Sequence, residues 1–263
     1  MTTGYSSNGL PFVRMEGGPR HLVIFEGLNF NHEPPSGLAL RMSVGAFKRL
    51  ANRFTVYYVG RRPGLPEGYP IKDMSDDYAT FIRDEMEAPV DIMGMSTGGP
   101  IAQQFAVDHR DLVRRLVLAA TGYRLSDEGA EAQRKVMNLV RGGKWRSAAA
   151  ALADVMSVGA TRPFLKAFFW MLGKGAFGSP DDLSDGLAEL EAEDRFDFGE
   201  RLSEIDVPTL VIGGGLDRLY PLRETAAGIP SAKLILYEKA GHMGVMRGRF
   251  SQDVLDFLKD GDG

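Results

Sequence analysis

The chain has 263 residues, of which 44% are hydrophobic and 25% charged, and its formal net charge is −4. This composition is typical of a globular protein and excludes a disordered, collagen-like or low-complexity chain. The slightly acidic balance, without a basic tract, argues against binding to nucleic acid or to an anionic membrane. We therefore expect a small molecule as the partner. The sequence leaves the oligomeric state open, with a homodimer as one option.

Cysteine is absent, which excludes disulfides, thiolate nucleophiles and thiolate metal sites. Residues 1–18 have no apolar core of the kind that a secretory signal needs, so we expect a cytoplasmic location. The most apolar later stretch, PFLKAFFWML at 163–172, contains a lysine. It is much shorter than the roughly 20 residues that cross a bilayer. We interpret it as a buried or interfacial helix and expect no membrane span.

Short runs rich in Val, Ile and Leu alternate with helical patterns along the chain. The runs that predict strands are residues 22–27, 54–60, 89–96, 113–122, 207–215 and 232–238. Apolar residues at spacings of three and four predict helices at 38–51, 73–86, 98–109 and 250–259. This alternation predicts an α/β fold, with a mostly parallel central sheet and helices on both of its faces.

The alternation stops after residue 122 and resumes near residue 207. Residues 123–204 show helical patterns only: EAQRKVMNLVRGG, KWRSAAAALADVMSVG, PFLKAFFWMLGKGAFG and PDDLSDGLAELEAEDRF. We interpret them as a helical cap inserted into a core domain made of residues 1–122 and 205–263. Such an insertion would cover the carboxyl edge of the sheet, where open α/β sheets keep their ligand sites.

The stretch DIMGMSTGGPIA, residues 91–102, contains Ser96 in a Gly-x-Ser-x-Gly pattern. This pattern alone is a weak signal, but here a predicted strand precedes it and a predicted helix follows it. A nucleophile elbow requires that context, because glycines permit the sharp turn that exposes the serine hydroxyl. The alternative is a glycine-rich junction of a phosphate-binding fold. Neither a Gly-x-Gly-x-x-Gly fingerprint nor a Gly-Lys-Ser/Thr loop is present to favour it.

A serine nucleophile needs a general base, which is usually histidine near neutral pH. His242 follows the last predicted strand, at the same edge of the sheet as Ser96, and is therefore the candidate base. A loop histidine satisfied by solvent is the alternative. The other histidines have less suitable positions, before the first parallel strand, in the loop after it, and at the far end of the helix behind the serine: His21, His32 and His109.

A carboxylate must orient that imidazole, and Asp217, just past the strand at 207–215, is the candidate. A surface aspartate in a turn is the alternative. The motifs GMSTGG, VPTLVIGGGLDRLYP and KAGHMG resemble the nucleophile elbow, acid loop and histidine loop of the α/β-hydrolase superfamily, in the same chain order. The resemblance covers nearly the whole chain. It implies an oxyanion hole made by the backbone N–H groups of Thr97 and Leu28, with no metal and no organic cofactor.

The sequence departs from the family pattern after the first parallel strand, where FEGLNF places Glu26 in the position of the usual histidine. We interpret Glu26 as a carboxylate bonded to backbone donors of its own loop, or as part of an altered oxyanion loop that selects the substrate. After the next strand, GRRPGLPEGYP replaces the usual acidic turn. We expect its arginines, Arg61 and Arg62, to lie on the solvated surface.

The predicted cap is rich in aromatic residues, which form either its core or a substrate pocket. The pocket candidates besides Glu26 are Trp145, Phe168, Trp170 and Met243. An apolar cap over the catalytic edge favours a hydrophobic substrate over a sugar or a phosphorylated metabolite.

The sequence thus predicts a serine hydrolase that cleaves a carboxylic ester or lactone of a small hydrophobic substrate through an acyl-enzyme. Three alternatives remain open. The first is carbon–carbon bond hydrolysis of a diketone-type substrate. The second is hydrolysis of a polyester, since parts of the chain weakly resemble intracellular polyhydroxyalkanoate depolymerases. The third is a hydrolase-fold protein that binds a ligand without turnover.

Overall fold

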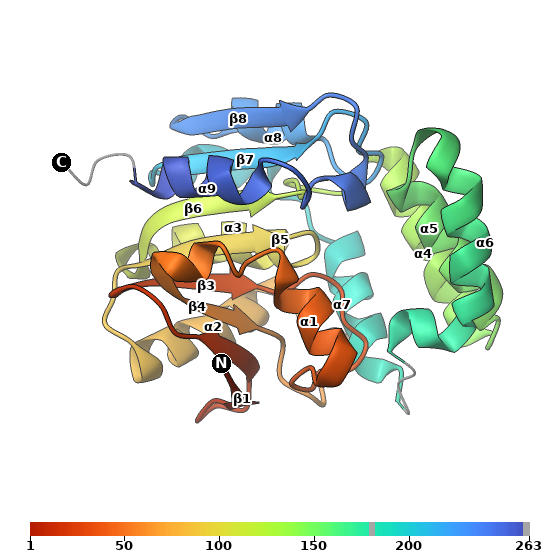
Figure 1. Cartoon of the computed structure of the whole chain (residues 1–263), viewed down its shortest axis with the longest axis horizontal. Coiled ribbons are helices and arrows are strands. Elements are labelled where there is room, and N and C mark those ends of the chain that lie inside the picture. Colours follow the sequence, from red (N-terminus) through yellow and green to blue (C-terminus); the bar gives the residue numbers. More distant parts are fainter. Residues whose placement is uncertain (179–181, 260–263) are drawn as a thin grey trace.

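One sheet of eight strands runs through the part of the chain that the structure describes, in the order β1-β2-β4-β3-β5-β6-β7-β8 (Figure 1). The computed structural model describes residues 1–178 and 182–259, without the side chains of Leu38, Ala39, Met42 and Ser43. The strands are β1 (Thr2–Tyr5), β2 (Pro11–Met15), β3 (Arg20–Phe25), β4 (Phe54–Val59), β5 (Val90–Met95), β6 (Val113–Ala119), β7 (Thr209–Gly214) and β8 (Ala232–Tyr237). β2 is antiparallel to β1 and β4, and all other neighbours are parallel. The predicted mostly parallel α/β fold is confirmed.

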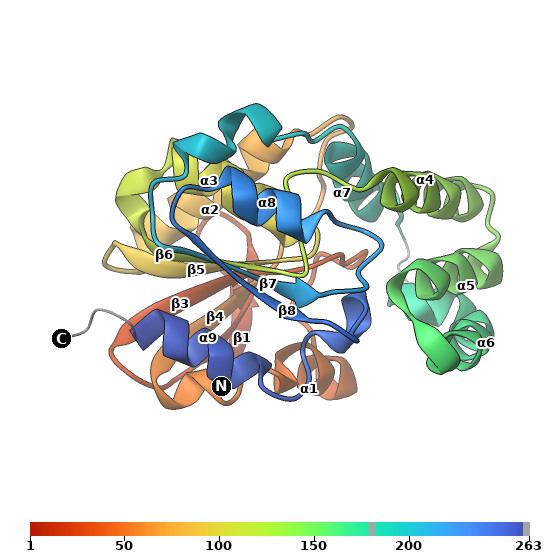
Figure 2. The same ribbon diagram turned by 90° about the horizontal axis from the view of Figure 1, so that it is seen from above.

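Helices cover both faces of the sheet because neighbouring strand residues point to opposite sides. In β3, Val23 and Phe25 join the core under one layer, while Leu22 and Ile24 join the core on the other side. The first layer contains α2 (Ile71–Glu85), α3 (Gly98–Asp108) and α8 (Leu222–Gly228), and the second contains α1 (Gly37–Gly45) and α9 (Phe250–Lys259) (Figure 2).

The predicted helices differ from the observed ones mainly at their ends. The bounds predicted for α9 are those observed, whereas the helix expected at 38–51 is divided into α1 and a separate turn of 3-10 helix at Leu50–Asn52. The α8 helix has no counterpart among the predicted elements. It is a short helix between β7 and β8, too brief for a periodic apolar pattern to develop.

In the described residues between β6 and β7, the α-helices are α4 (Asp127–Arg141), α5 (Trp145–Met156), α6 (Arg162–Leu172) and α7 (Ser184–Asp194). Figures 1 and 2 place α4, α5 and α6 beyond the carboxyl ends of the parallel strands, as a separate group of helices. In contrast, α7 packs Ala188 and Ala192 into the core beside α2 and α3. The division into core and cap stays a prediction. Residues 180 and 181, where the last cap pattern begins, and residues 260–263 of the predicted core lie outside the described residues.

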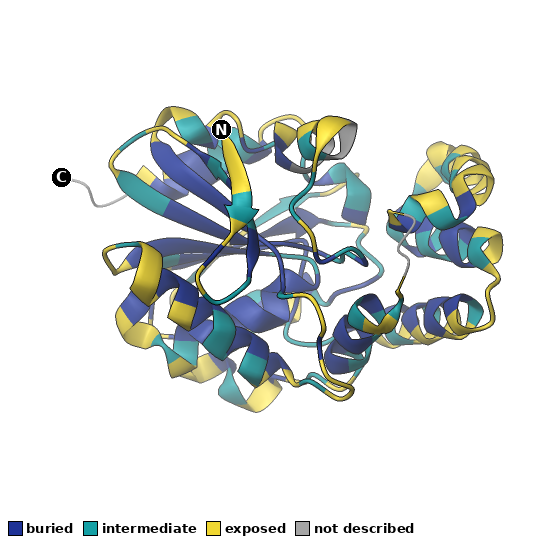
Figure 3. Cartoon of the chain, turned by 90° about the horizontal axis from the view of Figure 1, so that it is seen from below, coloured by how far each residue is buried: buried dark blue, intermediate teal, exposed yellow. Residues whose placement is uncertain are grey.

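The α6 helix lies on the outer surface, so of the two interpretations of its apolar sequence, a buried or an interfacial helix, the buried one is wrong. No residue of α6 is buried, and Figure 3 colours the outer helices of this group largely as exposed or intermediate. Phe164 and Met171 are 78% and 68% exposed. The helix packs on its neighbours through Phe169, which joins the apolar cluster formed with α4 and α5. Within residues 1–178 and 182–259, no helix combines the length and the apolarity that a membrane crossing requires.

Candidate active site

Ser96 occupies the sharp turn between β5 and α3. Its φ of 47° lies in the left-handed region, which residues other than glycine rarely adopt. The flanking glycines allow strand and helix to approach closely here. A Cβ on Gly98 would lie 2.3 Å from the carbonyl oxygen of Phe25, and one on Gly94 would lie 2.6 Å from the Cβ of Ala102. This close packing fixes the turn and places the serine at the carboxyl edge of the sheet.

Three side chains that are distant in the sequence meet at this edge. The Oγ of Ser96 lies 3.0 Å from Nε2 of His242, and Nδ1 of His242 lies 2.8 Å from Oδ2 of Asp217. The other carboxylate oxygen of Asp217 accepts a hydrogen bond of 2.8 Å from the backbone N–H of Leu219. The side chains of His242 and Asp217 are 5% and 0% exposed. The structure therefore brings together the three residues that the sequence predicted as nucleophile, base and orienting acid.

The loops that carry the acid and the base are joined to each other. His242 begins a turn of 3-10 helix, His242–Gly244, in the loop after β8, and Asp217 follows β7. The backbone N–H of Leu216 donates to the carbonyl of Ala240 at 2.9 Å, which ties the two loops together. A Cβ on Gly214 would lie 2.3 Å from the same carbonyl oxygen, so the approach requires glycine there.

This arrangement of hydrogen bonds could activate a serine as a nucleophile. Because a carboxylate only accepts hydrogen bonds, Asp217 selects the imidazole tautomer that carries its proton on Nδ1. Nε2 is then free to accept the proton of the Ser96 hydroxyl. Burial of the carboxylate also keeps water from weakening its attraction for the imidazolium that forms.

Two backbone N–H groups complete the arrangement. Leu28, in the loop after β3, and Thr97, which follows Ser96, both line the cavity beside the Ser96 hydroxyl. Among the described residues, neither backbone N–H has a protein acceptor. Free N–H donors beside a nucleophile are what an oxyanion that develops during attack on a carbonyl would require.

A cavity of about 430 Å³ lies over Ser96 and His242. Its walls come from the carboxyl edge of the sheet, from α4, α5, α6 and α7, and from the segment after α6. Most of the lining side chains are apolar: Met95, Val136, Leu152, Val155, Phe169, Phe177, Leu190, Met243 and Met246. No lysine, arginine, aspartate or glutamate is among the described lining residues. In the described ranges, no group of three or more His, Asp or Glu side chains is arranged to hold a metal ion.

Of the pocket candidates predicted from the sequence, Met243 lines the cavity and the four others lie elsewhere. Trp145 packs against Phe177, with ring centroids 5.7 Å apart, inside the apolar cluster of the helical segment. Phe168 and Trp170 lie on the exposed side of α6 and are 50% and 47% exposed. The aromatic residue of α6 that lines the cavity is Phe169, which lies between these two.

Glu26 is buried behind the loop that carries Leu28 rather than in the cavity wall. It accepts hydrogen bonds from Nδ2 of Asn29 at 3.2 Å and from the hydroxyl of Tyr58 at 3.1 Å, so its donors are side chains and not the expected backbone groups. Burial raises the pKa of Glu26, although the nearby guanidinium of Arg61 opposes the shift.

Arg61 differs most from its prediction. It was expected on the solvated surface, but it is 1% exposed and forms an ion pair with the equally buried Glu189 of α7. The signal in the sequence was its place directly after a buried strand, at the edge where the site forms. Arg62 is partly exposed and binds Tyr69 and Asp77.

A buried acid lies close to the catalytic candidates. The hydroxyl of Tyr220 donates to Oε1 of Glu193 at 2.6 Å, and the Tyr220 ring lies 5.7 Å from the imidazole of His242. Glu193 is 2% exposed, and its burial raises its pKa to about 7, against the effect of the Tyr220 hydrogen bond. Its protonation therefore changes near neutral pH.

The comparison with protein families gives a clear result. A model described as the alpha/beta hydrolase family matches residues 33–253. The chain belongs to the alpha/beta hydrolase family. This confirms the resemblance that was drawn from the three loop motifs.

The alpha/beta hydrolase has curated relatives with different reactions. A 2-hydroxy-6-oxononadienedioate/2-hydroxy-6-oxononatrienedioate hydrolase of a Pseudomonas species is 26% identical over 210 residues, which cover 74% of each chain. A pimeloyl-[acyl-carrier protein] methyl ester esterase of Neisseria meningitidis is 31% identical over 183 residues, covering 62% of this chain and 66% of the esterase. These relatives support hydrolysis and leave the substrate open.

Solved structures share the fold of this alpha/beta hydrolase. The enol-lactonase of Burkholderia xenovorans superposes with a TM-score of 0.75 at 20% identity, over 98% of this chain and 100% of the other. An esterase of Thermogutta terrifontis gives a TM-score of 0.74 at 22% identity, over 98% and 97%.

The raised pKa of Glu193 predicts a pH dependence of stability. Its folded pKa of about 7 exceeds the ordinary value of 4.5. The folded protein therefore holds this proton more tightly, and about 3 kcal/mol of stability present below pH 4.5 is lost as the pH rises through 7. Glu193→Gln should remove this loss.

Urea unfolding at pH 4.5 to 8 measures the effect. The free energy of unfolding of Glu193→Gln, relative to wild type, should rise by about 3 kcal/mol across this range. The exposed Glu200→Gln is the matched control and should show a flat difference. A flat difference for Glu193→Gln as well would contradict the assignment.

Proposed function

We propose that this alpha/beta hydrolase is a serine hydrolase that cleaves a carboxylic ester or lactone of a small hydrophobic acid through an acyl-enzyme. The observation that carries the proposal is the continuous chain of hydrogen bonds from Ser96 through His242 to Asp217, at the base of an apolar cavity. A serine in contact with a base that is itself oriented by a buried acid has the geometry of nucleophilic catalysis.

The reaction has two halves. His242 takes the proton of the Ser96 hydroxyl while Oγ attacks the carbonyl carbon, and the resulting oxyanion accepts hydrogen bonds from the N–H groups of Leu28 and Thr97. The imidazolium then donates its proton to the departing alkoxide, which leaves an acyl group on Ser96. In the second half His242 removes a proton from water, the hydroxide attacks the acyl carbon, and the acid is released as Ser96 regains its proton.

The cavity favours an uncharged acyl chain. Its described lining residues include no Lys, Arg, Asp or Glu, so a substrate carboxylate would be buried there without a lysine or arginine partner. The Pseudomonas relative is named for a dioate, which carries two carboxylates. The name of the Neisseria relative specifies a methyl ester. The lining thus argues for ester or lactone hydrolysis over carbon–carbon bond hydrolysis of a diacid.

Labelling with a fluorophosphonate tests the nucleophile. We expect a single adduct that maps to Ser96, no adduct on Ser96→Ala, and labelling at least ~100-fold slower on His242→Ala, because the base is removed. His109→Ala is the matched control, since His109 binds Asp76 instead of Ser96. A folded wild type that acquires no adduct would contradict the proposal and favour a ligand-binding protein.

A pair of esters of equal chain length tests the acyl pocket. p-Nitrophenyl hexanoate should be hydrolysed with a kcat/KM at least ~100-fold higher than the p-nitrophenyl monoester of adipic acid, because burial of an unpaired carboxylate is costly. Leu152→Lys, which adds a cation to the lining, should narrow this gap. Equal kcat/KM values for both esters in the wild type would contradict the assignment of an uncharged acyl chain.

A further inference from the structure

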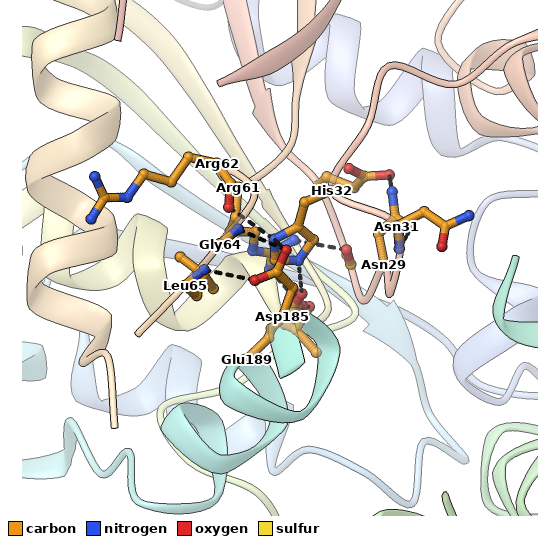
Figure 4. Close-up of polar contacts among 12 residues, drawn as sticks. Asn29, Asn31, His32, Arg61, Arg62, Gly64, Leu65, Asp185 and Glu189 are labelled. Atoms are coloured by element: carbon orange, nitrogen blue, oxygen red, sulfur yellow. Dashed lines mark hydrogen bonds and ion pairs between the residues drawn. The ribbon is translucent and has the colours of Figure 1, made fainter. Parts of the chain in front are cut away.

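Arg61 places a cation directly behind the proposed oxyanion hole. It follows β4 at the carboxyl edge of the sheet, and its side chain is 1% exposed (Figure 4). It is not among the residues that line the cavity, so it does not reach the substrate. Any effect on the reaction must therefore pass through the groups that it binds.

The guanidinium binds Thr97 and also Gly27, the residue before Leu28. Nη1 donates to the carbonyl oxygen of Gly27 at 2.8 Å. Nη2 donates to Oγ1 of Thr97 at 2.9 Å and lies 2.9 Å from Oε1 of Glu189. The Thr97 hydroxyl in turn donates to the same Glu189 oxygen at 2.5 Å. One planar group thus joins two separate loops.

The contact with Gly27 determines where the N–H of Leu28 points. The carbonyl of Gly27 and the N–H of Leu28 belong to the same trans peptide unit, which is planar, so the two groups point in opposite directions. Holding the carbonyl toward Arg61 therefore aims the N–H of Leu28 away from Arg61, and Leu28 itself lines the cavity. A charged donor on the carbonyl also polarises the peptide and strengthens the N–H as a donor.

The contact with Thr97 fixes the second donor. Its Oγ1 accepts from Arg61 and donates to Glu189, so both hydrogen-bonding functions of the hydroxyl are used. Thr97 has φ −59° and ψ −19° at the start of α3, directly after the strained Ser96. Locking its side chain from behind keeps the N–H of Thr97 in place beside the nucleophile.

The surrounding groups keep the guanidinium charged and its counterion in place. Burial alone would lower the pKa of Arg61, but Glu189, together with the nearby Tyr78, Glu26 and Glu193, outweighs this effect and the pKa is raised. The second carboxylate oxygen of Glu189 lies 3.4 Å from Nε2 of the buried His32. On the same helix, Asp185 accepts the backbone N–H groups of Gly64 and Leu65 at 2.9 and 2.6 Å, which holds α7 against the loop that carries Arg61 (Figure 4).

We propose that Arg61 is a positioning residue that holds the N–H groups of Leu28 and Thr97 in the geometry needed to bind the oxyanion, with Glu189 as its counterion. The proposal rests on the proposed serine hydrolase function. It assigns a role to a residue that touches neither the substrate nor the Ser96, His242 and Asp217 side chains. Its effect should be expressed in the transition state, when the oxyanion forms, and little in substrate binding.

The double variant Arg61→Met/Glu189→Gln tests this role. It removes both buried charges together, since Arg61→Met alone would leave Glu189 unpaired, and it keeps an acceptor for the Thr97 hydroxyl. With p-nitrophenyl hexanoate we expect kcat to fall about 10- to 100-fold. This fall is no larger than the fall in kcat that follows the removal of one oxyanion donor. KM should change by less than about threefold, because uniform binding is unaffected. The affinity for a trifluoromethyl ketone, which forms an oxyanion on Ser96, should fall by the same factor as kcat/KM.

Arg62→Met is the matched control, because the adjacent Arg62 side chain binds Tyr69 and Asp77 and does not contact Gly27 or Thr97. It should retain kcat and ketone affinity within about twofold, as expected for an exposed polar contact. A folded double variant with wild-type kcat and ketone affinity, or one with a raised KM and unchanged kcat, would overturn the proposal.

If the double variant does not fold, Thr97→Val replaces it as the test. This change removes only the hydroxyl that bridges Arg61 and Glu189, and it leaves their ion pair and the N–H of Thr97 in place. We expect kcat and the affinity for the ketone to fall together by about three- to tenfold, because the N–H of Thr97 would be less well held. Unchanged values of both would overturn the proposal. A wild type that is neither labelled at Ser96 nor active would instead show that the serine hydrolase function itself fails.

Discussion

Ser96 holds a φ of 47° where β5 meets α3, and the rest of the site is arranged around this constraint. A serine in the left-handed region costs about 1–3 kcal/mol, which the surrounding packing must offset. The close approach at Gly94 and Gly98 and the hydrogen bond from the Ser96 N–H to the carbonyl of Ala119 at 3.0 Å supply that packing. The hydroxyl consequently stands free of the sheet and within reach of His242.

The buried charges behind this turn connect the helical segment to the sheet. Arg61 comes from the loop after β4 and Glu189 from α7, so their ion pair joins two regions that the chain separates widely. A buried ion pair contributes little net stability but defines one arrangement of its partners, because a shifted arrangement would leave a charge unpaired. This requirement for one arrangement is consistent with the charged pair Arg61 and Glu189 at a buried position that apolar residues could fill.

The candidate nucleophile, base and acid could be predicted because parallel strands bring the loops at their carboxyl ends to one edge. Ser96 became the candidate nucleophile through its Gly-x-Ser-x-Gly pattern, the strand before it and the helix after it, together with the acid and histidine loops farther along the chain. The pocket could not be predicted equally well, since helical spacing defines an apolar side but not what covers it. Phe168 and Phe169 are neighbours, yet the first is exposed and the second lines the cavity. Arg61 was missed because its partner is supplied by a distant helix, which no local pattern indicates.

The proposed reaction passes through an acyl group on Ser96, and the partitioning of this acyl group between water and methanol can be measured. Phenyl butyrate and p-nitrophenyl butyrate would be hydrolysed in water that contains methanol, and the ratio of methyl butyrate to butyric acid would be measured for each. Both esters form the same acyl-enzyme after their leaving groups have departed, so we expect the same product ratio from both. Product ratios that differ between the two esters would contradict an acyl group on Ser96. Formation of the same two products by Ser96→Ala at the wild-type rate would contradict it as well.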